Sequence, residues 1–224
     1  MSIKKVSHSL FFYFISALGI SMCIKAMVGV SSFNALNTAL ADVLHLKIGT
    51  VTTIFNLFFL GVCWLMDAKR DKKHYLLMLV SLVSFGEIIN LFLYSFLSQV
   101  TFTSYGFRLL IFALGTIIGG LGTGQVLRLD LLKFPIENFC LLVSDRTQKS
   151  FSFYRYSFDI LCVGFSLLLT YSFSLPLFVR EGTLISLFLL SGAIGWSKNL
   201  FATPETLAPS VADNSTLSEK PTDY

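Results

Sequence analysis

Four polar side chains inside long apolar stretches are the residues best suited to chemistry. Glu87 is the only charged residue of the stretch 75–97, and Asn90 follows three positions later on the same face of a helix. Asn56 and Asp159 lie within two further apolar stretches. An ionised carboxylate costs about 3 kcal/mol at the centre of a membrane helix, so Glu87 must be protonated, paired or in contact with water. If the four converge, they either bind a coupling proton or a cationic group at Glu87, or fix helix packing through buried hydrogen bonds.

Asn34 and Glu137 form a second group of candidate site residues, because each lies just inside the start of a short segment. The segments, 31–43 and 135–145, are too short to span a bilayer. Each is either a helix lying flat at the membrane surface or a half-helix that dips into the membrane and lines a cavity. In the second case the positive N-terminal ends favour an anionic or carboxylate-bearing ligand, and Asn34 and Glu137 would line its site.

Catalytic, metal and cofactor sites are not predicted. The 4 cysteines form no C-x-x-C pair, and the 3 histidines have no spacing typical of metal ligands. Motifs for nucleophilic catalysis or for nucleotide phosphate binding are also absent from the sequence. The net charge of +4 needs no nucleic acid to explain it, since an excess of this size commonly faces anionic lipid. We therefore expect neither enzyme activity nor nucleic-acid binding.

The composition is that of an integral membrane protein, with the lipid bilayer as its surroundings. Hydrophobic residues make up 54% of the chain and charged residues 13%, against about a quarter charged in a soluble domain. The mean hydropathy is +0.72. Apolar stretches predict six transmembrane helices, at 10–29, 48–66, 75–97, 109–127, 156–179 and 182–197. The fourth contains Gly115-x-x-x-Gly119 and Gly120-x-x-x-Gly124, spacings that let another helix approach closely.

Charge placement predicts the orientation of these helices. If the N-terminus is cytoplasmic, the outer segments carry only Lys25, Lys47, Arg108 and Arg180 of the 17 lysines and arginines. This positive-inside bias places both termini and the basic loop 67–74 in the cytoplasm.

The order of features in 18–42 recurs in 121–145, which indicates an internal duplication. Each copy runs from an apolar helix through one basic residue and a helix-breaking patch to a short segment that ends on an aspartate. The candidate residues pair across the copies: Asn34 aligns with Glu137, and Asn56 with Asp159. Since three crossings per half invert the second half, the predicted fold is an all-α membrane protein of two inverted three-helix repeats.

The duplication also predicts how the chain divides. The first repeat occupies 1–100 with the half-helix 31–43, and the second occupies 101–201 with the half-helix 135–145. Residues 202–224 are rich in Thr, Ser, Pro and acidic residues, a composition typical of a disordered tail, here cytoplasmic.

Short motifs in both halves carry a family resemblance. The first half contains A-M-V-G-V-S-S-F-N-A-L at 26–36 and L-K-I-G-T at 46–50, and the second contains P-I-E at 135–137 and S-D-R-T at 144–147. Together they resemble the YitT/YczE-like family of small bacterial membrane proteins, whose first half typically reads A-x-x-G-x-x-P-W-[DN]-x-L. The resemblance implies a multi-pass protein of the bacterial cytoplasmic membrane, and the biochemical role of that family is poorly defined.

The chain departs from the family pattern at its helix breaks. Ser32 stands where the family has proline, Phe33 where it has tryptophan, and Leu132 where the second half has glycine. These are the places at which backbone would approach a ligand closely.

Two classes of function fit these features. The first is a small-molecule membrane transporter, or the substrate-binding membrane subunit of one, since many carriers build a site from inverted repeats with broken helices. The alternative is a non-transporting accessory protein, that is, a scaffold, chaperone or regulator of a partner membrane protein or enzyme. A homodimer or another membrane protein is a candidate partner in either class. The sequence names no ligand.

Overall fold

The computed structural model describes residues 3–67, 71–129 and 134–200. This part of the chain is helical, without strands. The helices are α1 (Ile3–Ala26), α2 (Ser32–Leu44), α3 (Ile48–Met66), α4 (Lys72–Leu91) with the π-helical turn η1 (Phe92–Phe96), α5 (Tyr105–Leu129), α6 (Pro135–Thr147), α7 (Phe151–Phe173) and α8 (Glu181–Asn199). The predicted tail 202–224 and Leu132 lie outside the described residues.

Five of these helices fit a multi-pass membrane protein by length and composition. They are α1, α3, α4 continued by η1, α5 and α7, with mean hydropathies between 1.4 and 2.1 over their most apolar windows. Helix α8 coincides with the sixth predicted crossing, 182–197, and has 19 residues. Its crossing, and the side on which each terminus lies, remain predictions.

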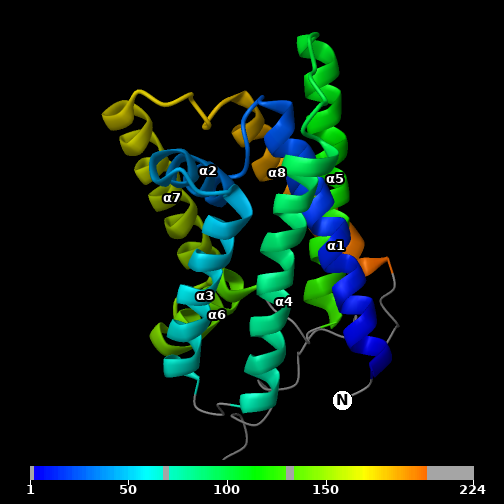
Figure 1. Ribbon diagram of the computed structural model, residues 1–224. Coiled ribbons are helices and arrows are strands. Elements are labelled where there is room, and N and C mark those ends of the chain that lie inside the picture. The colour runs from blue at the N-terminus through cyan, green and yellow to red at the C-terminus, as the bar shows by residue number, and fades with distance from the viewer. Residues whose placement is uncertain (1–2, 68–70, 130–133, 201–224) are drawn as a thin grey trace, which may run out of the picture.

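Helices α1 and α5 make the most extensive helix–helix contact in the described structure and run in opposite directions (Figure 1). Glycines on α5 allow the close packing, as the sequence predicts. A Cβ atom on Gly122 would lie 2.6 Å from the backbone nitrogen of Ser16, and one on Gly124 would lie 2.6 Å from the carbonyl oxygen of Ile194. Helix α5 therefore uses one glycine face against α1 and another against α8.

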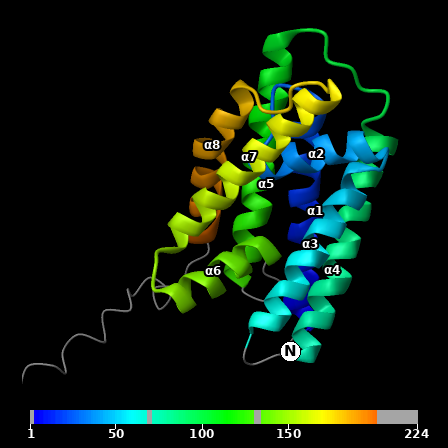
Figure 2. The ribbon, with the colours of Figure 1, turned by 90° about the vertical axis from the view of Figure 1, so that its left-hand side faces the viewer.

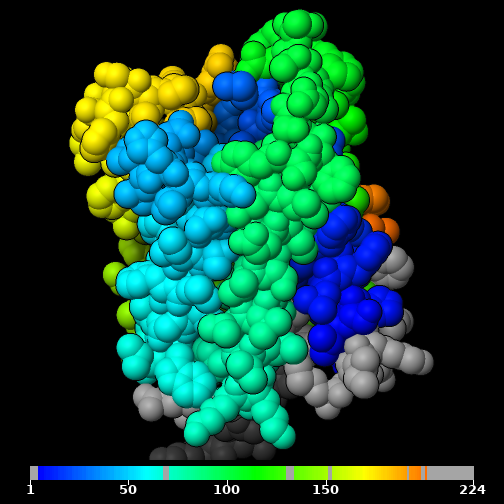
Figure 3. All heavy atoms as spheres, viewed as in Figure 1, coloured from blue at the N-terminus to red at the C-terminus, as the bar shows by residue number. Residues whose placement is uncertain are grey.

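The short helices α2 and α6 lie near opposite ends of the molecule (Figures 1 and 2). Helix α2 packs on α7 and α3, whereas α6 packs on α3 and α7. Helix α4 lies against α1 and α3, and α8 lies against α5. In the space-filling view α2, α3 and α4 cover much of one face (Figure 3).

Both short helices begin close to where the sequence predicts the half-helices. Helix α2 buries its polar residues as well as its apolar ones: Asn37 is fully buried, and Ser32, Asn34 and Thr38 are at most 9% exposed. A helix floating among lipid headgroups would leave such side chains in solvent. The polar face of α2 is instead turned toward protein.

Candidate functional site

The starts of α2 and α6 meet at a central cavity of about 130 Å³. A single water needs only about 10–15 Å³ by this measure, so the cavity has room for a small organic molecule or a group of waters. Its wall combines polar side chains with aromatic rings, and it draws on α1, α3, α5, α7 and α8 as well as on the two short helices. The polar lining includes Asn34, Asn56, Glu137 and Arg155.

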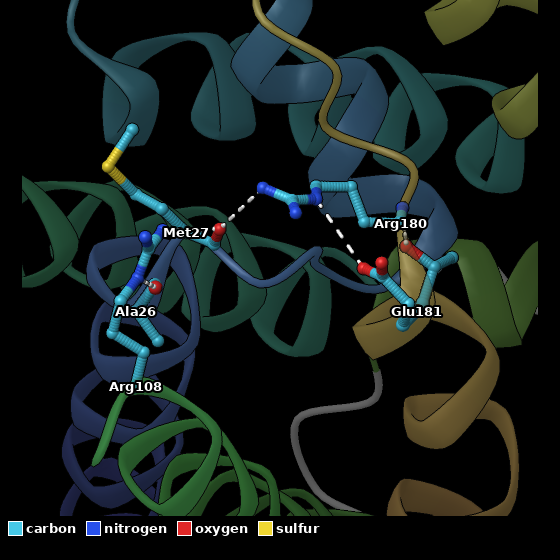
Figure 4. Close-up of polar contacts among 6 residues, drawn as sticks. Ala26, Met27, Arg108, Arg180 and Glu181 are labelled. Carbon is cyan, nitrogen blue, oxygen red and sulfur yellow. Dashed lines mark hydrogen bonds and ion pairs between the residues drawn. The ribbon is translucent and has the colours of Figure 1, made fainter. Parts of the chain in front are cut away.

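Two arginines from later parts of the chain bind the C-terminal end of α1 and thereby position the start of α2 (Figure 4). Arg108 donates from Nε to the carbonyl oxygen of Ala26 at 2.7 Å and from Nη2 to that of Met27 at 2.6 Å. Arg180 donates from Nη1 to the same Met27 oxygen at 3.3 Å and pairs with Glu181 at 3.5 Å. Carbonyls at the C-terminal end of α1 attract cations, which explains why Arg108 of α5 and Arg180, the residue before α8, converge there.

The connector from α1 to α2 needs unusual backbone conformations to make this turn. Met27 has φ 53°, and Gly29 has φ 119°, a value that side chains rarely tolerate. The Val28 carbonyl oxygen accepts a hydrogen bond of 3.0 Å from the backbone nitrogen of Gly182, at the start of α8. The connector is therefore held at three successive points, and the position of Ser31 and Ser32 follows from it.

At the start of α2, the Ser32 hydroxyl donates to Oδ1 of Asp159, which belongs to α7. The same oxygen accepts from Nη1 of Arg155 at 2.7 Å, one turn earlier on α7. The positive N-terminal end of α2 thus already has a carboxylate of the protein beside it. The Asp159 carboxylate therefore occupies the place at which the sequence predicts an anionic ligand.

The start of α6 carries its own carboxylate. Pro135 begins the helix, a position at which proline fits because the missing N–H has no helical partner. Glu137 lies in the first turn, with Oε1 at 3.8 Å from Nε of Arg155. Burial raises the pKa of the Glu137 carboxyl, an effect that Arg155 and its own backbone N–H oppose and the nearby Asp159 reinforces. The Glu137 side chain stays 23% accessible, and Glu137 is one of the residues that line the cavity.

A larger hollow of about 1110 Å³ lies at the far end of α1, lined by Lys25, Arg108 and Arg180. These three basic side chains donate hydrogen bonds to backbone carbonyl oxygens. The arginines bind carbonyls at the end of α1, and Lys25 donates to the Ser98 carbonyl oxygen at 3.2 Å. The central cavity, where a carboxylate has a looser partner, is the stronger candidate site.

Comparison with known proteins places this architecture in a family. The sequence profile of a family of unknown function, DUF6198, matches residues 3–199. The chain belongs to that family. It is also 28% identical to the uncharacterized protein YyaS of Bacillus subtilis (strain 168) over 141 residues, which cover 63% of this chain and 69% of YyaS. No solved structure matches it.

The family match shows that the chain is a DUF6198 protein, a less specific relationship than the one the short motifs suggest. The comparisons do not extend it to the YitT/YczE-like family, so that likeness stays one of short motifs. Neither the DUF6198 description nor that of YyaS names an activity.

Of the residues predicted for the site, the DUF6198 chain brings four together. Asn34, Asn56 and Glu137 line the cavity. Asp159 lies beside it, bonded to Ser32 and Arg155. In the described ranges 3–67, 71–129 and 134–200, no group of three or more His, Cys, Asp or Glu could hold a metal ion.

Asn90 and Glu87 do not join them, so the predicted cluster around Glu87 is not formed. Asn90 accepts from the backbone nitrogen of Gly49 at 2.9 Å and donates to Thr50 Oγ1 at 3.2 Å, which ties α4 to α3. Glu87 is exposed on the outer side of α4. Residues three apart on a helix differ in direction by about 60°, and here the edge of the buried face falls between Glu87 and Asn90.

Arg155 is the site residue that sequence reasoning missed. The apolar stretch predicts a helix from 156, which leaves Arg155 in a basic cytoplasmic segment, whereas α7 begins at Phe151. The available signal was the spacing of Arg155 and Asp159, since residues four apart pair on a helix. The sequence marks Ser32 as part of a helix-breaking patch at the start of the first half-helix and as a departure from the family pattern, but does not predict its contact with Asp159.

Proposed function

We propose that this DUF6198 protein is a small-molecule membrane transporter, or the substrate-binding membrane subunit of one, with its site in the central cavity. The observation that carries the proposal is that two short helices from different halves of the chain begin at one cavity. Carriers commonly place their substrate between repeats, at the ends of interrupted helices. A partly buried arginine with two carboxylates at the same point supplies groups able to bind or exchange a charged ligand.

An inverted repeat is part of this proposal and is supported by the pairing of contacts. Under the exchange of halves, α1 corresponds to α5, α2 to α6, α3 to α7 and α4 to α8. The packing of α2 on α7 then matches that of α6 on α3, and the packing of α1 on α4 matches that of α5 on α8. The extensive contact between α3 and α4 has no equally close equivalent between α7 and α8, so the halves differ there.

The proposed topology has six crossings, re-entrant α2 and α6, and both termini in the cytoplasm of a bacterial cell. Support comes from the charge bias and from the buried polar face of α2. Single cysteines at Lys72 and Thr103 test it by labelling with a membrane-impermeant thiol reagent. We expect Thr103→Cys to label in intact cells and Lys72→Cys only after permeabilisation; labelling of both in intact cells contradicts the topology.

A non-transporting accessory protein is the second candidate, and one observation favours it. Glu87 is exposed on a side of α4 that otherwise presents apolar residues such as Val80, Val83 and Leu91, at 53%, 43% and 46% exposure. Lipid around an ionised carboxylate is costly, and another membrane protein or a second copy of the chain would relieve that cost.

The experiment that separates the two classes is a thermal-shift screen of metabolites on the detergent-purified protein. The transporter proposal expects a compound that raises the melting temperature of the wild type and of Glu87→Gln, but not of Asn56→Leu, which replaces a cavity amide. That compound should then accumulate in proteoliposomes. A protein that binds no metabolite but co-purifies with one membrane partner in a Glu87-dependent manner supports the accessory class.

A further inference from the structure

The charged groups at the cavity do not balance. Arg155 contributes one positive charge and faces two carboxylates, Glu137 and Asp159. When both are ionised, the side chains of the described residues leave a negative excess, which the partial positive charges at the N-terminal ends of α2 and α6 reduce. The three side chains are only 13–28% exposed, so water screens this excess incompletely. Partly buried charge without a full counter-charge is unfavourable, so a further positive charge, either a proton or a bound cation, would stabilise this place.

The two carboxylates are not equivalent acceptors for that charge. Asp159 is already engaged at one oxygen by the Ser32 hydroxyl and by Arg155 at 2.7 Å. Glu137 has the looser ion pair, at 3.8 Å, and it is Glu137 that lines the cavity. A ligand in the cavity therefore meets Glu137 first.

The remaining wall suits an organic cation better than an anion. Phe33, Phe85, Phe112 and Phe134 contribute aromatic side chains, whose ring faces attract cations. Hydroxyl and amide groups, Asn56 among them, provide oxygen acceptors for an ammonium group.

We propose that the central cavity binds a small monovalent organic cation in exchange for a proton, and that Glu137 is the group at which the two alternate. This rests on the proposed function and specifies its substrate class. On binding, the O–H bond of the Glu137 carboxylic acid breaks, the proton leaves to solvent, and the carboxylate pairs with the cation. The net charge of the site is the same before and after, so neither state leaves a buried charge unpaired.

The titratable and charged groups around Glu137 come from three helices besides its own. From α7 it faces Arg155 and Asp159, the two charged groups already counted. Tyr13 of α1 and Cys140 of α6 also interact with its charge. The facing thiol of α3, Cys63, donates to the Pro135 carbonyl oxygen at 3.4 Å. Burial raises the pKa of Cys140 to about 11. Burial likewise keeps the pKa of Glu137 above its ordinary range, which brings protonation of this carboxyl nearer to neutral pH.

The test is calorimetric titration of the detergent-purified full-length protein with ethylammonium and tetramethylammonium, beside neutral acetamide and anionic acetate. Protons and cations compete in the proposal, so the affinity for the cations should rise with pH, by up to about tenfold per pH unit while Glu137 is mostly protonated. Titrations in buffers of different ionisation enthalpy should report release of up to one proton per bound cation.

Charge counting predicts the variants. Glu137→Gln and Asp159→Asn each leave one carboxylate for Arg155 and so remove the negative excess. Both should bind the cations at least about tenfold more weakly and release no proton, with Glu137→Gln keeping the melting temperature within a few degrees of the wild type. Glu87→Gln makes the same chemical change on the outer side of α4 and should keep wild-type affinity and proton release. If Asp159→Asn unfolds because the Ser32 contact is lost, Glu137→Gln decides alone.

Three results overturn the exchange: neither cation binds, the cations bind equally at every pH, or Glu137→Gln retains both affinity and proton release. The proposed function fails separately. Binding of acetate, acetamide or a neutral metabolite that Asn56→Leu abolishes would preserve the cavity as a ligand site while removing the cation exchange. Absence of any cavity-dependent ligand, from these probes and from the metabolite screen, removes both.

Discussion

The two short helices begin at the same cavity but are held there in different ways. Outside the site, Arg108 and Arg180 bind carbonyl oxygens at the end of α1 and hold the connector that leads to α2. Within the site, the Ser32 contact to Asp159 holds the start of α2 itself. The start of α6 carries a half-buried Glu137 whose ion pair with Arg155 is longer. The start of α2 is therefore held by several contacts, whereas the start of α6 has a carboxylate with one loose ion pair. Under the proposed inverted repeat and proposed function, the first half would supply the fixed helix start and the second half the ligand-binding carboxylate.

Arg155 connects the two starts, since it holds Asp159 beside α2 and faces Glu137 on α6. Removing one member of a buried ion pair leaves its partner unpaired in a medium that solvates it poorly. A change at Arg155 should therefore affect both starts, whereas changes at the connector or at Glu137 should affect only one.

The largest expected effect is that of Arg155→Gln, which strands two carboxylates together. Fully buried pairs lose about 3–5 kcal/mol on such a change, and we expect up to this amount here because the side chains are 13–28% exposed. The loss should be seen as a lower melting temperature in detergent and lower abundance in the membrane. Lys149→Gln is the matched control, since Lys149 lies just before α7, is exposed and has no carboxylate partner among the described residues. An Arg155→Gln protein as stable as the control would mean that the two starts are not coupled through this side chain.

Much of this arrangement could be predicted, and the failures have physical causes. The aligned repeats locate both short helices and pair Asn34 with Glu137 at their starts, and both residues line the cavity. Asn56, which the sequence places in a cluster with Glu87, lines this cavity instead. Hydropathy marks only where the apolar stretch of α7 begins, so it excludes Arg155, whose charge is tolerated inside the helix because Asp159 lies one turn away.

The error at Glu87 has a different cause. A carboxylate within an apolar stretch indicates an unusual site, but helical periodicity alone does not say which face turns inward. The arginine contacts to the end of α1 join segments far apart in the chain, and a single sequence contains no signal for such pairings.

A second prediction tests the scaffold role of α2. Arg108→Gln removes two charge-assisted hydrogen bonds to the end of α1 and should cost about 1.5–3 kcal/mol. The connector loosens, so a cysteine at Ser31 should react faster with a small thiol reagent than in the unaltered background. Arg180→Gln, which removes one weaker bond of 3.3 Å to Met27, should have the smaller effect. Equal reactivity of the Ser31 cysteine in all three backgrounds would show that the connector does not depend on these arginines.

A third prediction concerns the pH dependence of stability and tests the α6 start. Because burial raises the Glu137 pKa from its ordinary 4.5, the folded protein holds this proton more tightly than the unfolded chain does. The contribution to stability is full below pH 4.5 and is lost as the pH rises through the folded pKa. The melting temperature should therefore fall over this window in the wild type, and the fall should shrink in Glu137→Gln.

Asp42, near the end of α2, provides the control for that titration. Burial raises its pKa as well, against the lowering effect of His45, so its contribution has the same sign. Asp42→Asn should remove a separate, additive part of the pH dependence, because Asp42 lines the outer hollow and not the central cavity. If Asp42→Asn alone flattens the profile, the titrating carboxylate is not at the α6 start.

The smallest expected effect is at Glu87, and it sharpens the contrast between a carboxylate at the cavity and one on the outer side of α4. Glu87 is exposed, and the hydrogen bonds that tie α4 to α3 run through Asn90 instead. Glu87→Gln should therefore change the free energy of unfolding by less than about 0.5 kcal/mol, measured in detergent beside Glu137→Gln.

In the cell the same variant tests the alternative function. If a partner or a second copy covers Glu87, crosslinking through a cysteine at Val83 should decrease in Glu87→Gln while melting in detergent stays unchanged. Unchanged crosslinking and unchanged melting together would contradict the idea that a partner or a second copy covers Glu87.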